Sequence, residues 1–157
     1  NGDYNGDGRS DILWRNTSNG RNYMFQMNGA SFTGLPINTV GKQSWTVVGS
    51  GDYNGDGNSD ILWRNYTAQP GSSRGRNWVY LMNGNLIDQS LLINLEGDLN
   101  WDVVGSGDYN QDGRSDILWR HSTRGLNWMY QMNGNVIEET VILNKERNFD
   151  WEIVNRY

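Results

Sequence analysis

A nine-residue acidic segment occurs three times along the chain. It reads Asp-Tyr-Asn-Gly-Asp-Gly-x-Ser-Asp at residues 3–11 and 52–60, and it returns at 108–116 with Gln111 in place of the first glycine. Each copy continues directly into Ile-Leu-Trp-Arg. Self-similarity of this kind indicates a fold built from several copies of one small structural unit.

The tryptophans show how long that unit is. Trp45, Trp101 and Trp151 open the related segments Trp-Thr-Val-Val, Trp-Asp-Val-Val and Trp-Glu-Ile-Val. The first two lie 56 residues apart and the last two 50 residues apart. The difference is an insertion of six residues within 65–76, which is rich in Gly and Ser and which we expect to be an extended hairpin loop.

Each unit is predicted to contain four short strands and no helix. Gly, Asn or Asp bounds each strand, and β-branched or aromatic residues fill it. In the last full unit these strands are residues 101–105, 116–120, 127–132 and 140–143. The recurring Met-Asn-Gly at 27–29, 82–84 and 132–134 predicts a tight turn, because Asn-Gly adopts positive φ readily. The fold class is therefore all-β.

Tandem four-stranded units of about 50 residues are typical of β-propeller blades. The predicted blades are residues 151–157 joined to 1–44, then 45–100, then 101–150, within a single module of residues 1–157. Three blades are too few to close a ring, since propellers use about four to eight. Two alternatives follow. Either two chains form a six-bladed ring, each giving its last strand to the partner, or the chain is a piece of a longer propeller.

The acidic segments place oxygen ligands at every second position, as calcium loops do. An EF-hand needs a glutamate at position 12, where this chain has tryptophan, so a shorter loop is indicated. About three Ca²⁺ per chain would change the formal charge from -5 to +1. The alternative is that these residues form Asx turns that bond only their own backbone. The expected side-chain ligands are Asp3, Asn5, Asp7, Asp11, Asp52, Asn54, Asp56, Asp60, Asp108, Asn110, Asp112 and Asp116, with the carbonyls of Arg9, Asn58 and Arg114.

Composition argues against several classes of function. The cations are scattered and form no basic run, so nucleic acid is not an expected partner. No apolar stretch approaches the roughly 18 residues that would suggest membrane insertion. Cysteine is absent and His121 is the only histidine, which leaves no anchor for a nucleophilic triad. We therefore expect a protein that is not an enzyme.

The segment Gly-Asp-Tyr-Asn-Gly-Asp-Gly-x-Ser-Asp-Ile-Leu resembles the FG-GAP or VCBS family of calcium-binding propeller repeats. That family occurs in integrin α-subunit heads, in a fungal integrin-like lectin and in bacterial secreted proteins. The resemblance implies a calcium-stabilised recognition module that is secreted or on the cell surface. One departure is Val-Val-Gly-Ser-Gly at 47–51 and 103–107, where the family has a Phe-Gly/Gly-Ala-Pro segment.

Two kinds of partner remain open, a glycan or an extracellular protein. Repeated aromatic and polar residues would suit lectin-like carbohydrate binding at several equal sites. Alternating aromatic residues of the third strands are expected to form core between blades. A protein-interaction or structural repeat domain would instead use irregular features, namely segment 65–76 and His121. The candidate ligand-binding residues are Trp14, Arg15, Asn22, Trp63, Arg64, Asn77, Trp78, Trp119, Arg120, Asn127 and Trp128.

Overall fold

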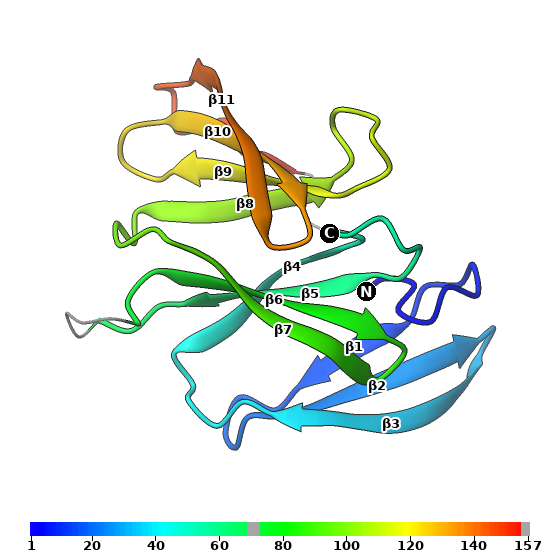
Figure 1. Ribbon diagram of the computed structural model, residues 1–157. Helices are drawn as coiled ribbons and strands as arrows, with labels where there is room; N and C mark the ends of the chain where they lie inside the picture. Colours follow the sequence, from blue (N-terminus) through cyan, green and yellow to red (C-terminus); the bar gives the residue numbers. More distant parts are fainter. Residues whose placement is uncertain (69–72, 155–157) are drawn as a thin grey trace.

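The computed structural model describes residues 1–68 and 73–154, which form three antiparallel sheets (Figure 1). Sheet A contains three strands: β1 (Ile12–Arg15), β2 (Arg21–Asn28) and β3 (Ser31–Thr39). Sheet B contains β4 (Trp45–Gly51), β5 (Asp60–Asn65), β6 (Arg76–Asn83) and β7 (Leu86–Leu95). Sheet C contains β8 (Trp101–Gly107), β9 (Asp116–His121), β10 (Leu126–Asn133) and β11 (Val136–Lys145). The all-β prediction is confirmed.

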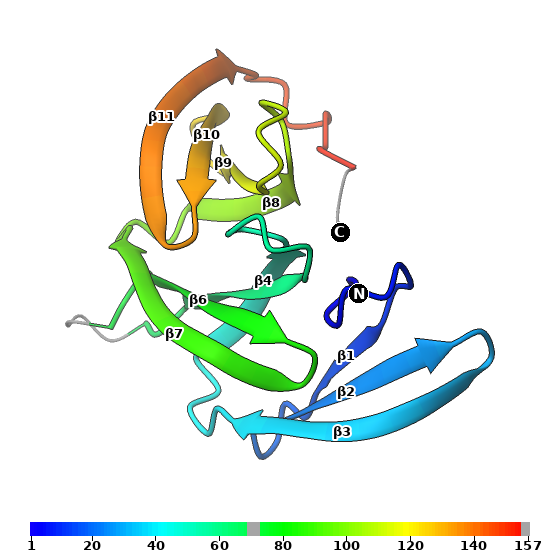
Figure 2. The same cartoon turned by 45° about the vertical axis from the view of Figure 1, so that its right-hand side comes forward.

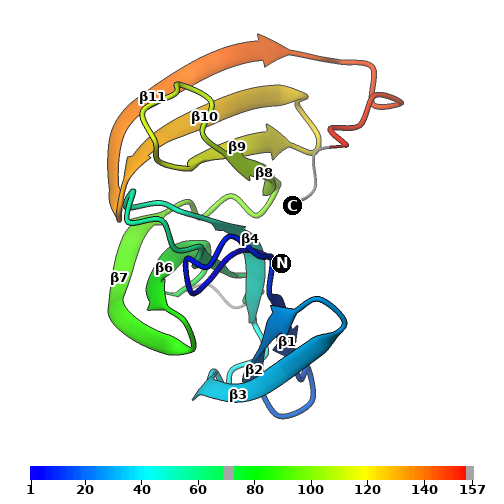
Figure 3. The ribbon, with the colours of Figure 1, turned by 90° about the vertical axis from the view of Figure 1, so that its right-hand side faces the viewer.

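Strands follow one another in chain order within each sheet, so every sheet is a meander. The first strands of sheets B and C, β4 and β8, lie against each other. Figures 2 and 3 show the three sheets placed along an arc that is open between sheet A and sheet C. This arrangement is consistent with part of a β-propeller.

The last two strands of each sheet are joined by a two-residue turn. In sheet B, Asn83 pairs with Leu86 and leaves Gly84 and Asn85 as the turn residues. Gly84 has a φ of 61°. A glycine with positive φ at the first central position is the pattern of a type II′ turn, whose twist matches that of the strands. The predicted tight turns are therefore present, with the glycine rather than the asparagine in the left-handed region.

Two apolar clusters lie between neighbouring sheets and form the core. One contains Tyr4 of the first acidic loop and Met24 of sheet A, together with Ile61, Trp63 and Met82 from sheet B. The other repeats this arrangement between sheets B and C, and its members include Tyr53, Leu62, Val79, Ile117, Trp119, Tyr130 and Met132. We call the side that presents Tyr4 or Tyr53 the leading face of a sheet, and the side that presents Trp63 or Trp119 the trailing face.

The predicted core role of the third strands is confirmed in sheets B and C but not for Tyr23 of β2, which is exposed. Tyr130 and Met132 on β10 are buried against sheet B, and Met82 on β6 is buried against sheet A. Side chains alternate between the two faces of a strand, so one strand can contribute to both clusters. Val79 and Leu81 accordingly project from β6 into the other cluster, against sheet C.

The prediction that Trp151-Glu-Ile-Val forms a strand is wrong for this single chain. Residues 151–154 have no regular structure, and Trp151 is 67% exposed. A strand needs a neighbouring backbone to bond its N–H and C=O groups. No other segment lies in place to pair with these four residues within the described part of the chain.

No helix within residues 1–68 and 73–154 is long and apolar enough to cross a membrane.

Candidate metal loops and the contacts between sheets

The side-chain oxygens of the first aspartate and the asparagine in each acidic loop accept from one backbone N–H. In the second loop the N–H of Asp56 donates to Asp52 Oδ1 at 3.1 Å and to Asn54 Oδ1 at 3.2 Å. Asp52 also accepts from the Gly57 N–H at 2.8 Å, and Asp56 Oδ1 accepts from the Asn58 N–H at 2.8 Å. The same bonds occur in the loops 3–11 and 108–116. The three loops therefore have one shape, and it brings carboxylate and amide oxygens together.

The last aspartate of each loop anchors the loop to its sheet. Asp60 is fully buried; its Oδ2 accepts from the Tyr53 N–H at 2.9 Å and its Oδ1 from the Met82 N–H at 2.9 Å. Asp11 and Asp116 make the equivalent bonds. These three carboxylates were predicted as metal ligands, and the structure also assigns them a role in fixing the loop to the third strand.

Burial makes the ionised form of Asp60 costly. Desolvation raises the pKa of its carboxyl to about 7, and the charges of Asp56 and Asp52 contribute in the same direction. The backbone bonds from Met82 and Tyr53 oppose this shift only partly. Burial likewise raises the pKa of Asp116. A cation beside these loops would favour the ionised forms and relieve the repulsion among the aspartates.

Two positions in each loop lie in the left-handed region. Gly57 has a φ of 89° and Gly55 a φ of 77°. The second glycine thus allows the chain to reverse. The first glycine position needs a positive φ as well, but it accepts another residue in the third loop. Gln111 also has a positive φ of 64°, the only non-glycine among the described residues to do so, so the loop demands this conformation in every copy.

The donor set of each loop consists of oxygen atoms, which suits a hard cation such as Ca²⁺. Two of these donors, the first aspartate and the asparagine, already converge on one N–H. Within residues 1–68 and 73–154, however, no group of three or more acidic, histidine or cysteine side chains is arranged so that it could hold a metal ion. The side-chain oxygens that converge in each loop come from one asparagine as well as from aspartates. The aspartate carboxylates already accept hydrogen bonds from backbone N–H groups of the loop.

A repeated arginine fixes the connection from each sheet to the next. The guanidinium of Arg64 donates to the carbonyls of Glu96 at 3.1 Å and Asp98 at 3.3 Å, and it stacks over Trp119 of the next sheet at 5.0 Å. Arg15 likewise bonds the carbonyls of Val40 and Trp45 and stacks over Trp63. These arginines were predicted to bind a ligand; in the structure they join neighbouring sheets.

Each of these arginines is in turn held by the predicted asparagine of its own sheet. The contacts join Arg15 to Asn22 at 3.1 Å, Arg64 to Asn77 at 2.9 Å and Arg120 to Asn127 at 3.1 Å. All three asparagines are buried. Trp63 and Trp119 are buried as well, so among the predicted ligand-binding residues the tryptophans with accessible surface are Trp14, Trp78 and Trp128.

Sequence reasoning missed the glycine that completes this arrangement. Gly75 has a φ of 70°, and its carbonyl accepts from the Glu96 N–H at 2.9 Å. A Cβ at this position would overlap the Glu96 carbonyl oxygen. Gly20 and Gly125 are in the same situation. The signal is present in the sequence as a repeated Gly-x-Asn at residues 20–22, 75–77 and 125–127.

Further hydrogen bonds join neighbouring sheets, and they occur twice. The hydroxyl of Tyr4 bonds Ser50 at 2.9 Å, and that of Tyr53 bonds Ser106. Burial raises the pKa of Tyr4 to about 12, which keeps this hydroxyl protonated at neutral pH. Two further backbone bonds also occur at both contacts. The N–H of Ser59 donates to the Asp3 carbonyl and that of Ser115 to the Asp52 carbonyl, both at 2.6 Å. The N–H of Gly84 donates to the Tyr4 carbonyl and that of Gly134 to the Tyr53 carbonyl, both at 2.7 Å.

His121 has a structural position, which corrects its expected use on an interaction surface. Its side chain is 1% exposed. Nδ1 accepts from the backbone N–H groups of Thr123 and Arg124, so the proton lies on Nε2, which faces Asp98 Oδ2 at 3.1 Å. The residue thereby replaces the turn-forming asparagines at 16 and 65. The other expected interaction feature, segment 65–76, includes residues 69–72, which lie outside the described residues.

An aromatic pocket of about 210 Å³ lies between sheet B and the connection that precedes it. Trp78 lies edge-on to Trp45 and donates its Nε1–H to Ser90 Oγ at 2.8 Å. Trp63 also contributes to the wall, and within the described part of the protein its Nε1–H is buried without a hydrogen-bond partner. The lining residues are Val40, Trp45, Trp63, Trp78, Tyr80 and Ser90.

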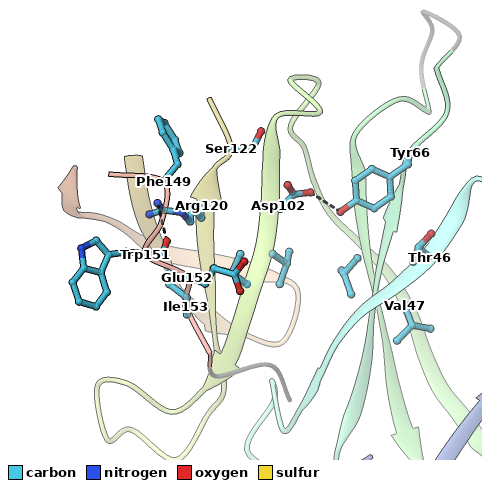
Figure 4. Close-up of a pocket in the computed structure, with 13 residues that line it drawn as sticks. Thr46, Val47, Tyr66, Asp102, Arg120, Ser122, Phe149, Trp151, Glu152 and Ile153 are labelled. Carbon is cyan, nitrogen blue, oxygen red and sulfur yellow. Dashed lines mark hydrogen bonds between the residues drawn. The ribbon is translucent and has the colours of Figure 1, made fainter. Parts of the chain in front are cut away.

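A larger pocket of about 580 Å³ lies among β4, β8 and residues 149–153 (Figure 4). The Tyr66 hydroxyl crosses from sheet B to bond Asp102 at 3.3 Å. On the other side Arg120 stacks over Phe149 and bonds the Trp151 carbonyl, as the figure shows. The lining carries charges of both signs, contributed by Asp102, Glu152 and Arg120.

Meandering sheets, repeated acidic loops and repeated contacts between sheets define a tandem-repeat protein of the β-propeller-like class. Residues 3–63 match the sequence model of the FG-GAP-like repeat, which supports the FG-GAP family for this part of the chain. The matched region includes the first two acidic loops. Comparisons with curated proteins and with solved structures gave no match.

Proposed function

We propose that this chain is a non-catalytic recognition module, stabilised by calcium, that binds carbohydrate in the manner of a lectin. The aromatic pocket beside β6 is the main observation behind this proposal. Trp45, Trp78 and Tyr80 supply partly exposed aromatic surface to its walls, and Ser90 supplies a polar group. Sugar rings stack on aromatic faces and need a few fixed hydrogen-bonding groups for orientation.

Calcium would be held by the three acidic loops and would serve the fold rather than a reaction. The first aspartate, the asparagine and the second aspartate supply side-chain oxygens in each loop, and the residue after the second glycine supplies a carbonyl. The last aspartate, already tied to the sheet, would complete the set. A bound divalent ion would offset two of the three negative charges in each loop and so reduce the repulsion among the carboxylates. Loops of this kind suit the millimolar calcium outside cells, so we place the protein on the cell surface or in the secreted fraction.

The carbohydrate proposal is tested by titration of simple sugars against the indole fluorescence of the protein. We expect galactose, N-acetylglucosamine or a related neutral sugar to change this fluorescence saturably. Trp78→Ala should weaken binding at least 10-fold, because one stacked ring contributes more than about 1.4 kcal/mol. Trp78→Tyr should keep most of the affinity, since Tyr23 occupies this position in sheet A.

Phe149→Ala provides the control for this titration, because Phe149 is an exposed aromatic residue that lines the other pocket. It should leave sugar affinity unchanged. Equal losses in Trp78→Ala and Phe149→Ala would argue against the aromatic pocket as the binding site. Thermal melts of each variant separate a lost contact from a lost fold.

The alternative is a protein-interaction module, and the larger pocket favours it. That pocket combines Arg120 with exposed aromatic surface from Phe149 and Trp151, and arginine and aromatic residues are enriched at protein interfaces. Binding of an extracellular protein that Arg120→Ala weakens, with no response to any sugar, would support this second function over the first.

A further inference from the structure

One peptide group of the second acidic loop connects that loop to the first. Its carbonyl belongs to Asn58 and is a predicted metal ligand. Its N–H belongs to Ser59 and donates to the Asp3 carbonyl of the first loop at 2.6 Å. The two groups of a trans peptide point in opposite directions. The Asn58 carbonyl accepts no hydrogen bond from residues 1–68 or 73–154, so it is available to a cation on the side away from Asp3.

A second peptide group extends this connection to a buried carboxylate of the first loop. The N–H in the same peptide group as the Asp3 carbonyl belongs to Tyr4, and it donates to Asp11 Oδ2 at 3.1 Å. Asp11 is the last predicted ligand of the first loop and is fully buried. Two peptide groups in series therefore join a carbonyl ligand of one loop to a carboxylate ligand of the loop before it.

The same two peptide groups join the third loop to the second. The N–H of Ser115 lies in one peptide group with the Arg114 carbonyl, and it donates to the Asp52 carbonyl at 2.6 Å. The next N–H, that of Tyr53, donates to Asp60 Oδ2 at 2.9 Å. The arrangement thus occurs at both contacts between neighbouring acidic loops, and in each case it ends on a carboxylate that is fully buried.

Close packing holds neighbouring loops against each other at the same positions. A Cβ on Gly6 would lie 3.0 Å from Asn58 Oδ1, and one on Gly55 would lie 3.2 Å from Arg114 Cγ. The residue that carries the predicted carbonyl ligand is therefore in contact with the preceding loop through its side chain as well. Closely packed groups transmit small displacements to one another, so a shift of this residue would be felt in that loop.

We propose that neighbouring acidic loops bind calcium with positive cooperativity, and that these peptide groups carry the coupling; this inference rests on the calcium binding proposed above. When the Asn58 carbonyl is bound to a cation, its peptide group is more polar, and the Ser59 N–H is a stronger donor. The Asp3 carbonyl then accepts a stronger bond, which makes the Tyr4 N–H a better donor to Asp11. The Asp11 carboxylate is thereby held in position for the ion of its own loop.

Repulsion between the cations of adjacent loops acts in the opposite direction, so the sign of the coupling shows which effect is larger. Linkage makes positive coupling reciprocal: a filled first loop strengthens binding at the second by the same factor. Coupling between distinct sites typically changes affinity by about 5-fold or more. The first and third loops share no hydrogen bond within the described residues, so their mutual coupling should be weaker than that between neighbours.

Calcium titrations followed by amide NMR of the 157-residue protein measure each loop separately. The N–H groups of Gly8, Gly57 and Gly113 each bond the first aspartate of their own loop, so their resonances report its occupancy. The double variant Asp108→Glu with Asp112→Glu keeps the charge of the third loop but misplaces two of its carboxylates. We expect it to abolish the calcium response of Gly113 and to weaken binding at Gly57 about 5-fold or more, with a smaller change at Gly8.

Asp112→Ala empties the third loop in a second way and should have the same effect at Gly57. Glu139→Asp is the matched control, because it changes the length of an exposed carboxylate side chain on β11 of the same sheet; all three titrations should stay unchanged. The dispersion of each NMR spectrum shows whether the variant is folded.

The possible results separate the coupling from calcium binding itself. An unchanged affinity at Gly57 in both third-loop variants would overturn the coupling and leave calcium binding intact. A tighter affinity there would also overturn it, because repulsion between the ions would then be the larger effect. If no loop of the unmodified protein responded saturably to calcium, the proposed calcium binding would fail and the coupling with it.

Discussion

Gly75→Ala should lower the free energy of unfolding by about 4 kcal/mol or more, a large fraction of the stability of a domain this size. Two effects combine. Alanine at a φ of 70° costs roughly 1–2 kcal/mol, and its Cβ overlaps the Glu96 carbonyl, which is backbone and cannot turn away. The displacement would break the Gly75–Glu96 bond and disturb Arg64, which holds the connection to sheet C. A melting temperature lower by roughly 10 °C is the expected observation.

Gly97→Ala is the matched control, since Gly97 follows Glu96 in the connection from β7 to β8 and lies close to Gly75. A Cβ there would meet nothing within 4 Å, and its φ is not in the left-handed region. We expect this variant to melt within a few degrees of the unmodified protein. If Gly75→Ala melted equally high, the close approach of residues 75 and 96 would not exist in solution.

Removal of calcium should also have a large effect. Ligand that binds only the folded state stabilises it by mass action, by about 1–2 kcal/mol per loop at roughly 2 mM Ca²⁺ if affinities lie near those of other extracellular modules. Three loops would together contribute on the order of 4 kcal/mol. Excess EDTA should then lower the melting temperature by on the order of 10 °C. An unchanged melt in EDTA would count against structural calcium.

Asp56→Asn separates a metal site from a simple turn, because the two interpretations predict different outcomes. The amide oxygen can still accept the Asn58 N–H, so the turn is kept. In EDTA the variant should be at least as stable as the parent protein, since the charge of Asp56 disfavours ionised Asp60. In calcium it should gain less stability than the parent. Asp88→Asn, on the exposed part of β7, should change neither melt; equal calcium responses in all three proteins would refute binding at this loop.

The strands and the loops were predictable because their signals are local. Alternating residues such as Trp78 and Tyr80 assigned the third strand of each repeat, and its predicted core role followed from the need of sheets to bury their faces. The spacing of oxygen-bearing residues likewise assigned the acidic loops. What remained open was which residues lie at the centre of a contact, since burial depends on the neighbouring sheet.

The arginine and asparagine side chains show this limit clearly. Arg64 and Asn77 are polar, repeated and adjacent to aromatic residues, a pattern that suits a ligand site equally well. The structure buries both and uses their hydrogen bonds to hold one sheet to the next. Long-range contacts of this kind have no short sequence signature, although the repeated Gly-x-Asn beside them was visible. Residues 151–154 differ for another reason: their pattern is that of a strand, but a strand requires a partner.

The most direct measurement of the proposed function is a glycan array probed with labelled protein in millimolar calcium and again in EDTA. We predict saturable binding to one class of sugar in calcium, weakened by Trp78→Ala, and a clear loss of signal in EDTA as the loops are stripped of metal. A blank array in calcium, from protein shown by its melt to be folded, would contradict the assignment of this chain as a carbohydrate-binding module.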